Sequence, residues 1–132
     1  MIKPHIYSWK KPYNWTENIL ECLTWGHRFI IRGARGWCYA DAQSLDDYLI
    51  SILIPALTEL KKSRQSYPII DENLSDEESV ELWNEKLDIM IKGFEAAKSI
   101  NEAPSLDSLY KQERLFKKGM REFAKYFFEL WD

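Results

Sequence analysis

The sequence predicts an all-α fold: a compact bundle of three long helices, with an additional amino-terminal helix and an extended arm rich in aromatic residues. Apolar residues recur at helical spacing in several long stretches, and helix-capping signals stand before them. Apolar residues make up 45% of the chain and charged residues 30%, which is enough apolar surface for a core. A length of 132 residues suits one domain, so we expect a single helical domain over 1–132.

Residues 1–13 are expected to form an extended arm. Two prolines and several aromatic residues stand in this stretch without any sustained period. Tyr7, Trp9 and Tyr13 would anchor such an arm, because aromatic rings are commonly buried in a core or in an interface.

A first helix is predicted over about 15–32. Asn14 or Thr16 can act as its N-cap, apolar residues follow, and Gly33 stands near its expected end. The stretch 28–32 also suits a strand, which leaves a second interpretation open for it.

The clearest periodicity predicts a helix over about 40–65. Its helically spaced apolar residues are Leu45, Tyr48, Leu49, Ile52, Leu53, Ala56, Leu57 and Leu60. Pro55 falls inside this pattern, where it removes one backbone donor and crowds the preceding turn. We therefore expect one helix that is kinked near 51–55.

A third helix is predicted over about 76–100. It begins with a capping box, in which Ser75 is the N-cap and Glu78 is the third helical residue. Its expected buried face holds Trp83, Leu87, Met90, Ile91, Phe94 and Ala97. Gly93 is expected to be a weak point, because glycine lowers helix stability. In the preceding loop, three apolar side chains are expected to pack against the bundle: Ile69, Ile70 and Leu74.

A last helix is predicted over about 105–131, after Pro104 and Ser105. Its apolar stripe consists of Leu106, Leu109, Phe116, Met120, Phe123, Phe127 and Leu130. We expect this stripe to complete the core.

The residues that commonly carry catalysis form no known constellation. His5 and His27 stand in no metal-binding spacing, and Cys22 and Cys38 stand in no CxxC pattern. No glycine-rich phosphate-binding motif occurs, and the acidic pairs of the predicted helices lack the histidines of a di-iron site. We therefore expect no enzyme activity, no metal and no cofactor.

The sharpest surface feature is a set of three arginines beside a tryptophan. Arg28, Arg32 and Arg35 would align on one side of a helix, next to Trp37. In one interpretation they bind an acidic protein surface or a phosphate backbone. In the other, which we favour, they pair with carboxylates at the start of the next helix: Asp41, Asp46 and Asp47. We expect Asp46 to be the main partner.

The charge of the chain and its targeting signals indicate which partners and which cellular location to expect. Residues 1–37 carry six basic and two acidic residues, whereas the remainder carries twelve and nineteen. The overall charge of -3 disfavours a dedicated nucleic-acid binder and leaves a protein as the expected partner. The chain shows no signal peptide and no apolar run of membrane-spanning length, so we expect a cytoplasmic protein without a membrane partner. The oligomeric state stays open.

A series of short motifs extends over about residues 35–132. They are Arg35-Gly36-Trp37, Asp41, Ser44-Leu45-Asp46, Ile54-Pro55-Ala56-Leu57, Tyr67-Pro68, Trp83 with Leu87-Asp88-Ile89-Met90-Ile91, Phe94-Glu95, and Phe123-Ala124-Lys125-Tyr126-Phe127-Phe128-Glu129-Leu130-Trp131-Asp132. This series resembles a family of small helical proteins, without an established function, that tailed bacteriophages encode. Where members of that family carry more charge or a tryptophan, this chain has Cys38-Tyr39-Ala40 and Ala42-Gln43. The resemblance implies a viral gene and a helical fold, and it implies no particular activity.

Three hypotheses for the function follow. The leading one is a phage-encoded, non-enzymatic accessory protein that binds a host or viral macromolecule and inhibits a host enzyme or defence system. The second is a virion component, such as a head or neck accessory subunit, whose aromatic arm reaches onto a neighbouring copy. The third is a small metal-dependent or nucleotide-acting enzyme. For the leading hypothesis the candidate interaction residues are Arg28, Arg32, Arg35 and Trp37.

Overall fold

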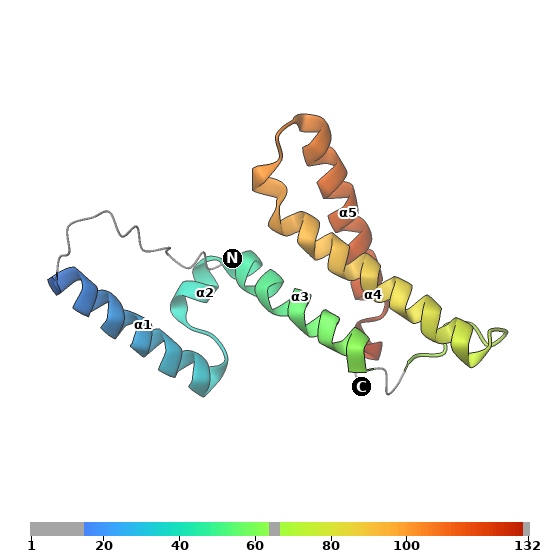
Figure 1. Cartoon of the computed structure of the whole chain (residues 1–132), viewed down its shortest axis with the longest axis horizontal. Coiled ribbons are helices and arrows are strands. Elements are labelled where there is room, and N and C mark those ends of the chain that lie inside the picture. The colour runs from blue at the N-terminus through green and yellow to red at the C-terminus, as the bar shows by residue number, and fades with distance from the viewer. Residues whose placement is uncertain (1–14, 64–66, 131–132) are drawn as a thin grey trace. The chain divides into compact units, whose positions relative to one another are not determined.

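The computed structural model describes residues 15–63 and 67–130, with side chains from residue 19 onward. In this part of the chain every regular element is a helix, which confirms the all-α prediction (Figure 1). The contacts divide the chain into two compact units, Met1–Tyr48 and Leu49–Asp132, and each is described by itself. The expected arm of residues 1–13 lies outside the described residues.

Helix α1 spans Trp15–Arg35 in the first unit. It runs without interruption through 28–32, so the strand interpretation of that stretch is wrong. It also extends past Gly33 to the next glycine, Gly36, whose φ of +83° is a conformation that side chains with a Cβ rarely adopt. A glycine in this conformation ends the helix and turns the chain toward the next element.

The predicted helix over 40–65 is two helices. A short helix α2 spans Tyr39–Gln43, and α3 spans Leu45–Ser63. The two helices are separated at Ser44, because a serine with two acidic residues in the helical turn after it, Asp46 and Asp47, is itself a helix-start signal. Pro55 lies inside α3, which is helical on both sides of it. The bend at this proline stays a prediction.

Helix α4 spans Asp76–Lys98 and begins as predicted. The backbone N–H of Ser75 donates to Glu78 Oε2 at 2.9 Å, and the N–H of Glu78 donates to Ser75 Oγ at 3.3 Å. These reciprocal bonds satisfy amide groups that the first turn of a helix leaves unpaired. The face predicted to be buried is buried at Trp83, Leu87, Met90 and Phe94.

Helices α4 and α5 form a tight hairpin. The 3₁₀ turn η1, Ile100–Glu102, leads from α4 into α5, Leu106–Lys125, and the two helices lie side by side (Figure 1). A short 3₁₀ turn η2, Phe127–Glu129, follows α5, so the last α-helix ends before the predicted 131. The C-cap Tyr126 still donates its N–H to the carbonyl of Glu122, at 3.0 Å.

The core of the second unit joins three of its helices. Its buried residues are Leu57, Trp83, Leu87, Met90, Phe94 and Tyr126. Lys61 of α3 donates to Asp88 of α4 at 2.7 Å, which adds a polar contact beside the apolar ones. In the loop before α4, Ile70 packs against this core as predicted. Ile69 does not, because its side chain is 77% exposed.

Candidate functional site

The candidate site is built around one buried carboxylate, Asp41 of α2, which is only 2% exposed. Arg32 of α1 donates from Nε to Asp41 Oδ2 at 2.8 Å, and its Nη2 donates to Asp41 Oδ1. Two parallel bonds from one guanidinium fix the orientation of both side chains. The ion pair therefore ties the last turn of α1 to the first turn of α2.

Two more contacts close the turn between these helices. The backbone N–H of Cys38 donates to Asp41 Oδ2 at 2.7 Å, so Asp41 also caps its own helix. The hydroxyl of Tyr48, in the first turn of α3, donates to the carbonyl of Gly36. We call the set Arg32, Gly36, Cys38, Asp41 and Tyr48 the Asp41 clamp.

The clamp fixes the charge states of its two ionised members. The hydrogen bonds from Arg32 lower the pKa of the Asp41 carboxyl well below its ordinary range, and the backbone N–H of Cys38 adds to the effect. Burial acts in the opposite direction and is outweighed. The pKa of Arg32 is raised, chiefly by the same hydrogen bonds. Both groups stay charged at neutral pH, so Asp41 is not a general acid or base there.

The structure revises the sequence-based pairing in two respects. The carboxylate partner of Arg32 is Asp41, one of the three acidic residues expected for the arginines. Asp46, which we expected to be the main partner, is exposed and has no ion pair within the described residues. The reason is the break at Ser44, which places Asp46 in a separate helix. The pairing that we favoured therefore holds for Arg32, whereas Arg28 and Arg35 are exposed.

Arg35 and Trp37 form an exposed platform beside the clamp. The Arg35 guanidinium lies 4.1 Å from the centroid of the Trp37 ring, and its Nε donates to the carbonyl of Trp37 at 3.0 Å. The Trp37 side chain is 44% exposed. Arg28 is exposed as well, and it forms no ion pair with any carboxylate that the structure describes. We call Arg28, Arg35 and Trp37 the Arg-Trp surface.

Sequence reasoning missed further exposed residues next to this surface. Trp25 and Phe29 of α1 stack at 5.7 Å between ring centroids and are 69% and 66% exposed. Tyr39, which follows the clamp residue Cys38, is 71% exposed. The helical periodicity that predicted α1 carries this signal, because it marks an apolar face and that face needs a partner.

The remaining chemistry of the described residues is limited. They contain no group of three or more histidine, cysteine or carboxylate side chains that could hold a metal ion. Cys22 is exposed, Cys38 is buried, and both are free thiols. None of the described helices combines the length and the apolarity needed to cross a bilayer.

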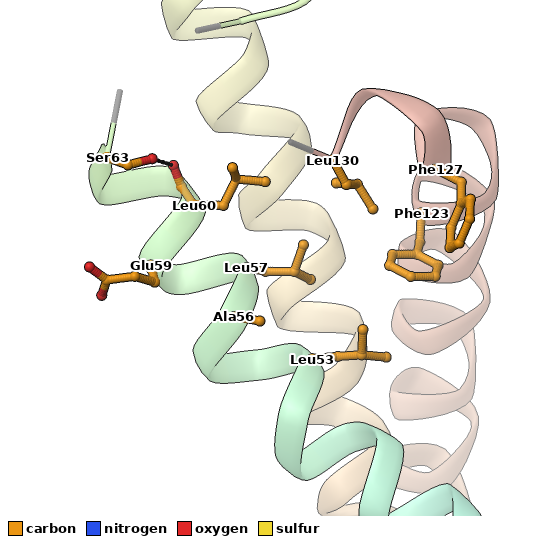
Figure 2. Close-up of a pocket in the computed structure, with 9 residues that line it drawn as sticks. All are labelled: Leu53, Ala56, Leu57, Glu59, Leu60, Ser63, Phe123, Phe127 and Leu130. Carbon is orange, nitrogen blue, oxygen red and sulfur yellow. Dashed lines mark hydrogen bonds between the residues drawn. The ribbon is translucent and has the colours of Figure 1, made fainter. Parts of the chain in front are cut away.

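A separate pocket lies in the second unit, with a volume of about 560 Å³. Figure 2 shows its lining, which comes from α3 and from the end of α5 with the residues that follow it: Leu53, Ala56, Leu57, Glu59, Leu60, Ser63, Phe123, Phe127 and Leu130. The Ser63 hydroxyl donates to the carbonyl of Leu60 at 2.8 Å, so it is already satisfied at the rim. The pocket offers an apolar surface with almost no polar group to orient a ligand.

Comparisons of the chain with protein-family models, with curated proteins and with solved structures found no match.

Proposed function

We propose that this chain is a phage-encoded, non-enzymatic accessory protein that binds a protein partner in the cytoplasm of the infected cell and inhibits a host enzyme or defence system. The viral origin rests on the motif series over residues 35–132. The packing of all the helices into one compact bundle also stays a prediction. The alternative of a virion component depends on residues 1–13, which lie outside the described residues.

The observation that carries the proposal is the Arg-Trp surface. A guanidinium stacked on an exposed indole presents a planar donor and an apolar ring together, and arginine and tryptophan are the residues most enriched in binding hot spots. The Asp41 clamp holds the backbone on both sides of Trp37. A surface that is already ordered loses less conformational entropy when it binds.

The chemistry of this surface favours an acidic protein partner. Arg28 and Arg35 bring two exposed cations that take no part in the clamp, and Trp37 adds an exposed apolar ring against Arg35. A carboxylate takes a guanidinium through two parallel hydrogen bonds. The net charge of -3 for the whole chain disfavours a phosphate backbone, which would be attracted by a basic protein.

The test is affinity capture from lysate of the host, with nuclease added, using wild type and the double variant Arg35→Glu/Trp37→Ala. We expect the wild type to retain one or a few proteins that the variant loses. A matched control is Lys111→Glu/Tyr110→Ala, which also reverses one exposed cation and truncates one exposed aromatic ring.

The control separates specific binding from general charge effects. It should retain the same proteins as the wild type, because its two changes lie on α5. Equal capture by all three proteins, or capture that depends on nucleic acid, would contradict a protein-binding role for the Arg-Trp surface.

A further inference from the structure

Helix α5 presents one side on which cations are aligned. Six residues of this helix are basic and three are acidic, which gives it a net charge of +3 in a chain whose overall charge is -3. Four of the cations stand at i, i+4, i+7 and i+11, which places them on one side of the helix within an arc of about 60°. All four are exposed: Arg114, Lys118, Arg121 and Lys125. We call them the α5 basic stripe.

The acidic residues of α5 do not neutralise this stripe. Glu113 and Glu122 lie outside the arc, where Glu113 pairs with Lys117 at 2.6 Å and Glu122 pairs with Lys86 of α4 at 3.7 Å. Asp107 lies on the side of the stripe, but it stands in the first turn of α5, about 10 Å before the first cation of the stripe. None of the four cations forms an ion pair with a carboxylate that the structure describes.

Packing on the opposite side of α5 directs the stripe outward. There Gly119 packs against Gly93 of α4, and Phe116 and Phe123 pack against the core of the second unit. The stripe extends over about 16 Å from its first residue to its last. The cations therefore form a straight row on a helix that is held in place by its other side.

The composition of the stripe favours phosphates over a protein surface. Lysine is depleted in the cores of protein interfaces, and such cores need apolar or aromatic anchors, which the arc of the stripe lacks. Phosphate contacts need only cations, and lysines and arginines that follow one helix are typical of nucleic-acid-binding proteins. One strand of duplex DNA carries a phosphate about every 3.4 Å along the axis, so a row of about 16 Å spans about five phosphates.

A lipid surface also offers phosphates, but it fits α5 less well. A helix that lies on a bilayer buries its apolar face among the lipids. The apolar face of α5 is already packed in the second unit, so only its charges remain for a partner.

The net charge of the chain does not oppose a phosphate contact at α5. At physiological ionic strength, exposed charges that are more than about 8 Å apart are largely screened from each other, so a phosphate at α5 responds chiefly to the stripe. The Arg-Trp surface differs in this respect, because it offers two cations rather than four aligned ones.

We propose that the α5 basic stripe binds the phosphate backbone of duplex DNA without reading its sequence. The stripe belongs to the second unit, whereas the Arg-Trp surface belongs to the first. The proposal goes beyond the proposed function, whose capture experiment contains nuclease. Either of the two can therefore fail while the other stands.

The test measures binding of the full chain to a labelled DNA duplex of arbitrary sequence, by fluorescence anisotropy over a series of salt concentrations. Each neutralised phosphate contributes about 0.9 to the slope of log K against log salt, so four contacts predict a slope of about -3.6. Lys118→Gln/Arg121→Gln should halve this slope to about -1.8 and weaken binding at low salt by at least about tenfold.

The matched control is Lys92→Gln/Lys98→Gln, which removes two exposed cations from α4. It lowers the charge of the chain by the same amount and should keep the wild-type slope. All four substituted residues are exposed, and circular dichroism checks that both variants keep their helix content. A wild type that does not bind the duplex, a wild-type slope in the stripe variant, or an equal loss in the control would each overturn the proposal.

Two competitors test the class of the partner. Polyglutamate stands for an acidic protein, and vesicles that contain phosphatidylserine stand for a lipid surface. We expect each of them to displace the labelled duplex only at a higher concentration of negative charge than unlabelled duplex requires. Displacement by either competitor at an equal or lower concentration of charge would overturn the assignment to nucleic acid.

Discussion

Gly93 of α4 and Gly119 of α5 pack backbone against backbone. A Cβ built on Gly93 would lie 2.7 Å from the Cα of Gly119, and one built on Gly119 would lie 2.8 Å from the Cα of Gly93. Both residues are buried, and the backbones of the two helices approach each other closely there. The pair allows the apolar faces of the hairpin to meet without a gap.

Gly119→Ala is therefore expected to destabilise the protein. Alanine raises helix propensity by up to about 1 kcal/mol, but the new methyl group has to push two helices apart, which costs about 1 to 3 kcal/mol in overpacked sites. Urea unfolding followed by circular dichroism measures the net change. Gly33→Ala is the matched control, because its Cβ meets nothing within 4 Å, and it should be neutral or stabilising. Equal stability of Gly119→Ala and wild type would contradict the close crossing.

Removing the clamp carboxylate should loosen the connection between α1 and α2. Asp41→Asn leaves the Arg32 guanidinium without its charged partner and weakens the cap on Cys38, with an expected loss of about 1 to 3 kcal/mol. Hydrogen exchange at the amides of residues 36–41 measures this loss locally. Asp46→Asn removes a carboxylate without an ion pair within the described residues and should change stability by less than about 0.5 kcal/mol. Equal effects of the two variants would argue against the clamp.

The clamp should also give the protein an acid-sensitive component of stability. The pKa of Asp41 in the folded protein lies below its ordinary value of 3.8. The clamp therefore contributes its full stabilisation at pH values above 3.8. As the pH falls below 3.8, the unfolded chain binds protons before the folded one, so stability decreases toward the folded pKa. Exchange protection of residues 36–41 should follow this curve in the wild type. The same dependence in Asp41→Asn would show that another group causes it.

The capping box at the start of α4 is expected to contribute measurably to the free energy of unfolding. Ser75→Ala removes the acceptor for the Glu78 amide and should cost about 0.5 to 2 kcal/mol. Thermal unfolding is a sufficient measurement, because α4 is the centre of the second unit's core. Ser105→Ala removes the equivalent acceptor for the Ser108 amide at the start of α5 and should have a cost in the same range. If the melting temperature of either variant equalled that of the wild type, this interpretation of the helix starts would be contradicted.

Helix α4 could be predicted from the sequence because its signals are local. The capping box and the apolar spacing both act within a few residues, and the structure places Ser75, Glu78, Trp83 and Leu87 as expected. The close packing at Gly93 could not be predicted, because it does not depend on local signals. Helix propensity describes the effect of a glycine on its own helix. The small size of Gly93 matters here because it packs against Gly119, which lies 26 positions later in the chain.

The candidate site was predicted in part. The arginines and Trp37 could be selected from their spacing, and pairing with an acidic residue could be expected from their charge. The choice of Asp41 over Asp46 depended on the break at Ser44, which places the two carboxylates in different helices, and the apolar period that starts at Leu45 does not show this break. The stacking of Arg35 on Trp37 depends on the turn at Gly36, and periodicity carries no information about that turn.

The different roles of two neighbouring arginines are the central claim, and a comparison of Arg32→Glu with Arg35→Glu tests it most directly. Both variants reverse one charge in the last turns of α1, and each is measured for unfolding and for affinity toward the captured partner. We predict that Arg32→Glu lowers stability, because it faces Asp41, and that Arg35→Glu unfolds like the wild type but binds at least about tenfold more weakly. Undiminished binding by Arg35→Glu, or undiminished stability of Arg32→Glu, would contradict the account.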